Sequence, residues 1–357
     1  MKYTDEFPIF STKVPGVTER FDLSTPEGRA AYFEAKAGNE VRMLADYFMD
    51  NTFIAYLLAK KVAGKGTYIK LLREIFGDEH IGHVSIGDVI RAAHAVVESG
   101  DEKEKKKFIE SLRAGYRGYI SFDDALDALT GRTQDKLLPT EFTLALLKQE
   151  VDTMPVKSLF VDGFPRELDQ VSYALFFRDL INYRDDPDVF IAIDVPEAVI
   201  DERMRYRVVC PVCQTPRNTK LLTTRDVSYD EKTKEFYLVC DEHGERMVPK
   251  EGDAAGIESI RERVDRDGKL IDTVFSLHGV PRILVHNAVP ASTALDYVDD
   301  YEITPAYSYA WDEKEHKVIV NESPWTVADD EGVEVVSLLA PAVLLALIKQ
   351  LPSVLGV

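Results

Sequence analysis

The chain has 357 residues, 45% of them hydrophobic, which is enough to fill one α/β core with insertions or two domains. Its formal net charge of −19 argues against nucleic-acid binding, because a protein that neutralises phosphate backbones is usually basic. The first residues lack the apolar core of a signal peptide, and the longest apolar stretch, residues 335–348, is too short to span a bilayer, so we expect a cytoplasmic protein without a nucleic-acid or membrane partner.

Residues 1–50 are predicted to form an N-terminal extension that begins as a loop and becomes helical near Thr25. The Thr25 hydroxyl can cap this helix, and Pro26 suits its first turn. An apolar stripe further along the helix is expected to pack on the main sheet: Met43, Leu44, Tyr47 and Phe48.

A glycine-rich turn, Gly64-Lys65-Gly66-Thr67, follows an apolar run and precedes a helix-like pattern. A strand that feeds such a turn directs backbone N–H groups and a helix N-terminus at one point, which suits a phosphate chain. Lys65 can then bridge the outer phosphates, and the Thr67 hydroxyl can reach a Mg²⁺ ion or a phosphate. The usual pattern opens with a glycine where this chain has Ala59, so an ordinary strand–turn–helix is the alternative.

Strands are predicted near residues 53–59, 83–85, 158–162, 189–195 and 282–287, with helices between them. This alternation predicts an α/β fold in which helices cover both faces of a parallel sheet. Because the carboxyl ends of parallel strands meet at one edge, Asp162 is expected beside the glycine-rich turn. There it can orient the hydration shell of a Mg²⁺ ion, while Arg166 binds a phosphate with two hydrogen bonds.

The Gly-Lys-Gly-Thr turn and the stretch from Asp162 to Arg166 (Asp-Gly-Phe-Pro-Arg) together resemble the adenylate kinase family of nucleoside monophosphate kinases. Further pieces fall in the family's order over about residues 52–300: Ser85 to Arg91, Leu138 to Glu141, Gln170, Ile193 to Pro196, Arg203, Arg207, Arg261 and Arg263. The resemblance implies a P-loop NTPase-type sheet and reversible, Mg²⁺-dependent transfer of a phosphoryl group from ATP to AMP, giving two ADP.

The resemblance also implies a role for each matching residue. ATP would be held by Gly64, Lys65, Gly66, Thr67, Arg203 and Arg207, with Arg203 stacked on the base. The monophosphate would be held by Ile86, Asp88, Arg91, Gly163, Arg166, Gln170 and Arg261, with Gln170 reading the base. Positioning and charge neutralisation during transfer would depend on Lys65, Asp162, Arg166, Arg207, Arg261 and Arg263.

Two departures from the family pattern leave alternatives open. Ile86 stands where a hydroxyl residue is usual, which leaves room for a kinase that prefers UMP or CMP. At the far end of the expected lid, Lys250 replaces an arginine and loses the bidentate fork, so the lid roles of Lys250 and Asp253 stay open. Together with Ala59, these changes support a second alternative, an inactive nucleotide-binding protein on the same fold.

All three cysteines lie in two chelating pairs, Cys210 with Cys213 and Cys240 with His243. Two residues between ligands let both point at one metal, and two such turns complete a tetrahedral Zn²⁺ site. Four protein ligands close the coordination sphere, so this zinc is expected to be structural. Unpaired thiols are the alternative, while a zinc ribbon for nucleic acid is disfavoured because the segment has no basic surplus.

The segment around this site, about residues 206–252, is polar and has few residues for a core, so a metal would supply its folding energy. The resemblance places it as the zinc lid over ATP, as in the long members of the family. We therefore expect an N-terminal extension (1–50), a kinase core (51–300) with an enlarged monophosphate-binding subdomain (about 86–151), and a C-terminal extension (301–357).

The C-terminal extension has no counterpart in the resembling family. Residues 317–320 predict a strand. The apolar stretch 335–348 predicts a buried terminal helix with a break at Pro341, and the last 20 residues predict a helix. Packing or dimerisation is expected of this extension, with a monomer as the main prediction and a dimer through the extension as the alternative.

Overall fold

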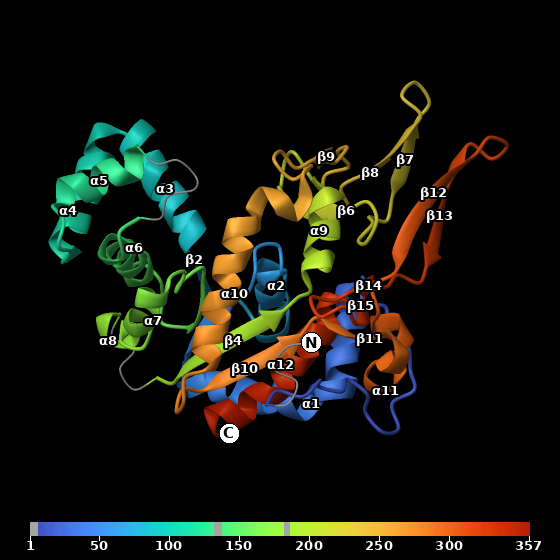
Figure 1. Ribbon diagram of the computed structural model, residues 1–357, viewed down its shortest axis with the longest axis horizontal. Helices are drawn as coiled ribbons and strands as arrows, with labels where there is room; N and C mark the ends of the chain where they lie inside the picture. Colours follow the sequence, from blue (N-terminus) through green and yellow to red (C-terminus); the bar gives the residue numbers. More distant parts are fainter. Residues whose placement is uncertain (1–5, 132–137, 182–185) are drawn as a thin grey trace.

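The computed structural model describes residues 6–131, 138–181 and 186–357. At its centre is a five-stranded parallel sheet in the order β10-β4-β1-β3-β2 (Figure 1). Its strands are β1 (Ile54–Leu58), β2 (Ile81–Ser85), β3 (Ser158–Asp162), β4 (Asp188–Asp194) and β10 (Arg282–His286). The predicted parallel α/β sheet is confirmed, and each of the five strands lies where the sequence places it.

Side chains of the central strands alternate between two cores, one on each face of the sheet. In β1, Ala55 and Leu57 enter the first core, whereas Ile54, Tyr56 and Leu58 enter the second. This follows from the two-residue period of a strand. Because both faces are covered, the strand reads as a continuous apolar run in the sequence.

Helices cover both faces of the sheet, as predicted. The first core is formed with α1 (Pro26–Asp50), α2 (Lys65–Phe76), α9 (Glu197–Arg205) and α12 (Ala340–Leu355). The second is formed with α3 (Ile86–Ser99), α4 (Glu102–Gly115), α5 (Phe122–Thr130), α6 (Thr140–Asp152), α7 (Leu168–Ala174), α8 (Phe177–Leu180) and most of α10 (Arg261–Phe275). Helices α3, α4 and α5 form a lobe to one side of the sheet (Figure 1). The predicted cap of α1 is confirmed, since Thr25 accepts a hydrogen bond from the backbone N–H of Gly28.

The prediction of one C-terminal helix broken at Pro341 is wrong. Residues Glu334–Ser337 form β15, which pairs with β11 (Ala288–Pro290) and β14 (Val327–Ala328). Helix α12 begins only at Ala340, so Pro341 lies in its first turn. A proline is favoured there because its missing N–H has no partner within the helix. Short helices follow β11 on the way to this region: η2 (Ala291–Thr293), α11 (Ala294–Tyr297) and η3 (Asp300–Glu302). Another short helix, η1 (Gly256–Ile260), directly precedes α10.

The two terminal extensions pack against each other. Helix α12 contacts α1, α2 and β10. Glu302 is fully buried and accepts hydrogen bonds from Tyr32 Oη at 2.6 Å and Lys36 Nζ at 2.8 Å, both on α1. The expected packing role of the C-terminal extension is therefore confirmed, while the oligomeric state stays a prediction.

A hairpin of the C-terminal extension reaches the segment that carries the predicted zinc ligands. Strands β5 (Arg207–Val209), β6 (Pro216–Asn218) and β9 (Val248–Pro249) form a small sheet, and β7 (Val227–Asp230) pairs with β8 (Glu235–Leu238). The hairpin of β12 (Ala306–Asp312) and β13 (Lys317–Ser323) extends beside β7 and β8 (Figure 1). Trp311 stacks on Tyr229 with ring centroids 4.9 Å apart, and Tyr309 Oη donates to the carbonyl oxygen of Thr219 at 2.7 Å. Among the described residues, no helix has the length and apolarity needed to cross a membrane.

Candidate active site and metal centre

The glycine-rich turn wraps around the side chain of Lys65. Gly64, the residue before α2, has a φ of 98°, a left-handed conformation that glycine adopts without a Cβ penalty. Lys65 Nζ donates to the carbonyl oxygen of Ala59 at 3.0 Å and lies 3.7 Å from Asp162 Oδ1. The expected position of Asp162 beside this turn is confirmed. Gly66 and Thr67 are exposed in the first turn of α2, and the Thr67 backbone N–H donates to the carbonyl oxygen of Gly64 at 2.9 Å.

Val62, in the same turn, also has a left-handed backbone, with a φ of 68°. A β-branched side chain is rare in this region, and the conformation costs about 1–2 kcal/mol for a residue with a Cβ atom. Such strain persists only where the surrounding structure holds it, and it is concentrated at functional sites.

A cavity opens where β1 and β3 end. Lys65, Asp162, Arg166 and Arg263 line it, together with Asp267. Asp267 belongs to none of the motifs found in the sequence; it lies one helical turn after Arg263 and 3.9 Å from its Nε. Burial raises the pKa of Asp267, against the opposing influence of Arg263, Lys65 and Arg166. Three cations and two carboxylates thus share one cavity at the carboxyl edge of the sheet.

Arg91 and Arg166 both lie beside Gly87 at the start of α3. A Cβ atom added to Gly87 would lie 3.4 Å from Nη1 of Arg91 and 3.8 Å from Nη2 of Arg166. Arg91 pairs with Asp88, and both side chains are exposed. Gly163, with a φ of 80°, brings the chain past the Arg166 guanidinium. Two guanidinium groups at one point suit a phosphate.

Two residues predicted to contact the monophosphate, Ile86 and Gln170, are buried and contact other parts of the protein. Ile86 is 1% exposed and packs in the second core, which counts against a contact between its side chain and a nucleotide. Gln170 is 3% exposed. Its Oε1 accepts from the Arg166 backbone N–H at 2.8 Å, and its Nε2 donates to Thr140 Oγ1 at 3.3 Å. In this conformation Gln170 orders the turn that carries Arg166, and its role in reading the base stays a prediction.

Two of the predicted arginines lie next to the cavity without lining it. Arg203 donates to the side-chain oxygen of Asn287 at 3.0 Å and contacts the carbonyl oxygen of Ala63 at 3.4 Å, so it borders the glycine-rich turn. Arg207 is paired with Asp253, which is 5% exposed. The predicted stacking of Arg203 on the ATP base stays a prediction.

Arg261, a further predicted arginine, does not line the cavity and forms ion pairs with two glutamates. It pairs with Glu197 and, at 2.7 Å, with Glu258. These pairs raise its pKa, Glu258 most strongly. Arg261 therefore reaches a phosphate only if it exchanges these partners, and its assigned role stays a prediction.

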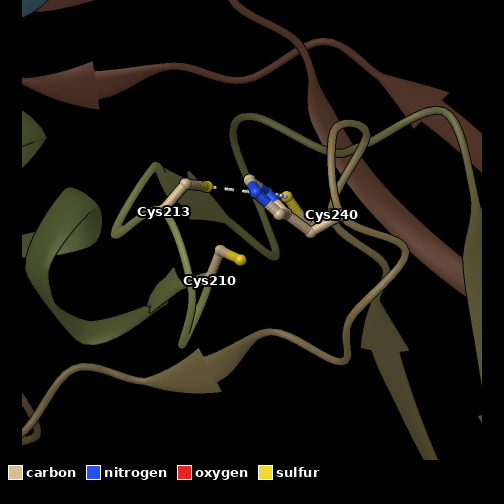
Figure 2. Close-up of side chains that lie close together, drawn as sticks. Cys210, Cys213 and Cys240 are labelled. Atoms are coloured by element: carbon tan, nitrogen blue, oxygen red, sulfur yellow. Dashed lines mark hydrogen bonds between the residues drawn. The ribbon is translucent and has the colours of Figure 1, made fainter.

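The predicted zinc ligands lie together in space. Cys210 and Cys213 come from the turn between β5 and β6, and Cys240 and His243 from the turn after β8. One ligand atom of each lies within 4.8 Å of the others, and the three thiols point toward one another (Figure 2). The sulfurs of Cys213 and Cys240 are 3.8 Å apart. With Zn–S bonds of about 2.3 Å, two sulfurs of a tetrahedral site are separated by about 3.8 Å, so the residues fit a zinc ion.

The cavity residues also fit a magnesium–nucleotide complex. Mg²⁺ takes oxygen ligands and keeps several waters, and Asp162 and Asp267 supply carboxylate oxygens beside the cations. A parallel sheet whose first strand runs into a phosphate-binding turn, and whose neighbour delivers an acid and an arginine, defines a P-loop nucleoside monophosphate kinase, a phosphotransferase.

No protein-family model matches the chain. Among curated proteins, the chain is similar to the adenylate kinase of Clostridium tetani, with 28% identity over 210 residues, 58% of this chain and 78% of that protein. It is also similar to the adenylate kinase of Thermotoga maritima, with 28% identity over 213 residues, 59% and 79% of the two chains. For the adenylate kinase of Kosmotoga olearia the identity is 30% over 209 residues, 58% and 78%. The chain belongs to the adenylate kinase family.

Proposed function

We propose that this protein catalyses the reversible transfer of the terminal phosphoryl group of ATP to AMP, giving two ADP. The observation that carries the proposal is the cavity in which Lys65, Arg166 and Arg263 converge beside Asp162. The relatives are named adenylate kinases, which supports AMP as the acceptor.

Phosphoryl transfer asks the protein mainly for in-line positioning and for cancellation of charge. Lys65 exchanges the carbonyl oxygen of Ala59 for the outer phosphates of ATP, which the N–H groups of Gly64, Gly66 and Thr67 also bind. Mg²⁺ bound with ATP supplies further neutralisation. Asp162 accepts hydrogen bonds from the waters that surround it.

The acceptor phosphate lies against the guanidinium groups of Arg91 and Arg166, which both border Gly87. Arg263 faces the same cavity as Arg166, so it bridges the acceptor and the transferring group. Arg207 reaches the transferring group from the base of the zinc lid when its pairing with Asp253 loosens. Closure of that lid excludes water, which would otherwise accept the phosphoryl group.

A coupled assay of ADP formation with Mg·ATP tests the proposal, with AMP, UMP, CMP and GMP as parallel acceptors. We expect clear preference for AMP, and a loss of at least a hundredfold in Lys65→Ala, because a donor to the transferring phosphates is removed. A preference for UMP or CMP would reassign the acceptor. Tight ATP binding without turnover would instead favour a nucleotide-binding protein without kinase activity, an alternative supported by Ala59, Lys250 and the buried Ile86.

A further inference from the structure

Two adjacent lysines, Lys60 and Lys61, lie between β1 and the glycine-rich turn. Their environments differ. Lys60 Nζ is paired with Asp330 at 2.8 Å and with Glu197 at 3.3 Å. Lys61 is half-buried and, among the residues that the structure describes, has neither a hydrogen bond nor an ion pair. The like charges of Arg263, Arg207 and Lys250 act on Lys61, and Asp253 opposes them. Arg263 lines the same cavity as Ala59 and Lys65, which flank Lys61 in the sequence. We call Lys61, Arg207, Lys250 and Arg263 the cationic group.

This cationic group joins three separate parts of the chain. Lys61 comes from the phosphate-binding turn, Arg207 and Lys250 from the two ends of the zinc-binding segment, and Arg263 from α10. The two ends of the segment are held together, since the Lys250 backbone N–H donates to the carbonyl oxygen of Arg207 at 3.2 Å.

The carboxylates near the group do not balance its charge. Asp253 pairs with Arg207, and Asp267 lies 3.9 Å from Arg263, so four cations and two carboxylates leave a charge of +2. Burial lowers the pKa of Lys61, and repulsion from Arg263, Arg207 and Lys250 lowers it further, against the opposing influence of Asp253. Holding like charges together costs free energy unless an anion neutralises them. The surplus lies next to the turn whose backbone suits a phosphate chain.

We propose that Lys61 is a further phosphate-binding residue, which contacts the outer phosphates of a bound nucleoside triphosphate together with Arg207, Lys250 and Arg263. The proposal rests on the proposed function and assigns a residue that the Gly-Lys-Gly-Thr motif does not contain. Lys250 can offer a phosphate only an ammonium group, which lacks the bidentate fork of an arginine. In this arrangement Lys61 supplies a further positive charge beside it.

Two binding measurements on Lys61→Met test the proposal: isothermal titration with ATP and the same titration with inorganic tripolyphosphate. A hydrogen bond to a charged group contributes about 1.5–3 kcal/mol, so we expect Kd to rise roughly 10- to 100-fold for both probes. Lys61→Arg, which keeps the charge, should recover most of the affinity. Lys70→Met is the matched control, because Lys70 is exposed on α2 and its nearest carboxylate oxygen, on Glu242, is 4.0 Å away.

The melting temperature without ligand separates binding from a structural role. Removal of a repelled cation should leave the ligand-free Lys61→Met protein as stable as the wild type or more stable, while ATP stabilises it less. A ligand-free protein that melts well below the wild type, or a Kd equal to that of Lys70→Met, would overturn the proposal. A wild type that binds ATP through Lys61 but forms no ADP would refute the kinase function alone.

Discussion

The buried cluster around Glu302 makes Lys36→Met the most informative test of how the two terminal extensions are joined. Lys36 Nζ lies 2.8 Å from Glu302 Oε1 and 2.6 Å from Asp299 Oδ2, and the side chains of Lys36 and Glu302 are fully buried. Methionine keeps most of the apolar stem and removes the charge. Glu302 would then remain as a buried carboxylate with only neutral donors, among them the Tyr32 hydroxyl.

Removing one partner of a buried ion pair costs about 3–5 kcal/mol, because the other charge is left uncompensated. With an unfolding entropy of about 2.1 cal/mol/K per residue, the 357 residues give a fall of roughly 4–7 °C in Tm if the chain unfolds in one step. Burial alone would lower the pKa of Lys36, but Asp299 and Glu302 raise it. The contribution of Lys36 to stability is therefore complete at neutral pH and is lost only as the pH rises through that raised value.

Urea unfolding at pH 7, with calorimetry for Tm, measures the effect. Lys13→Met is the control, because Lys13 is partly exposed and lies 3.9 Å from the same Asp299, where such a pair contributes at most about 1 kcal/mol. Adding Glu302→Gln to Lys36→Met should restore much of the stability, since the stranded charge is then removed. A loss below about 1 kcal/mol in Lys36→Met, or no recovery in the double variant, would refute this reasoning.

Four further outcomes are expected elsewhere in the chain. Elemental analysis should find one zinc per chain, and Cys213→Ser should lose it and open residues 206–252 to limited proteolysis; a metal-free wild type of equal protease resistance would contradict this. Trp311→Ala removes the stack on Tyr229, worth about 0.5–1.5 kcal/mol, and should speed amide exchange in β7 and β8, whereas unchanged exchange would contradict the contact. Val62→Gly should be about 1 kcal/mol more stable than Val62→Ala in urea unfolding, because glycine relieves the strain at φ 68°; the reverse order, usual at ordinary positions, would refute the strain. Burial raises the pKa of Asp188 to about 7, so the contribution of Asp188 to the free energy of unfolding is full below pH 3.8 and is lost as the pH rises through 7. Asp188→Asn should flatten this fall with pH, and an unchanged pH profile would contradict the prediction.

The sheet and the phosphate-binding turn could be predicted because their signals are local. A strand buried on both faces, such as β1, is a short apolar run, and the glycines after it mark a turn with its own chemistry. The candidate zinc ligands could be predicted equally well, since the two short spacings between them are the whole sequence signal. Pro341 misled the prediction because an apolar run of this length fits a strand followed by a helix as well as one broken helix.

Residues that act through long-range neighbours could not be predicted in the same way. Lys61 stands in the turn without a motif position of its own, and only the folded chain brings it near Arg207, Lys250 and Arg263. The pairing of Arg261 with Glu197 likewise joins α10 to α9, 64 residues apart. For Asp267 one signal was available, because it follows Arg263 by four residues and so shares its helix face.

The contacts of the hairpin formed by β12 and β13 limit how the segment that carries the candidate zinc site can move. Tyr309 donates to Thr219, the Tyr307 backbone N–H donates to the Lys220 carbonyl oxygen at 2.7 Å, and Trp311 stacks on Tyr229. At about 1 kcal/mol for each hydrogen bond and about 1 kcal/mol for the stack, separation costs about 3 kcal/mol. A closing motion that broke these contacts would be disfavoured more than a hundredfold, since each 1.4 kcal/mol is a factor of ten. The segment and the hairpin are therefore expected to move together, and amide exchange in β12 and β13 should change with that in β7 and β8 when ATP is added.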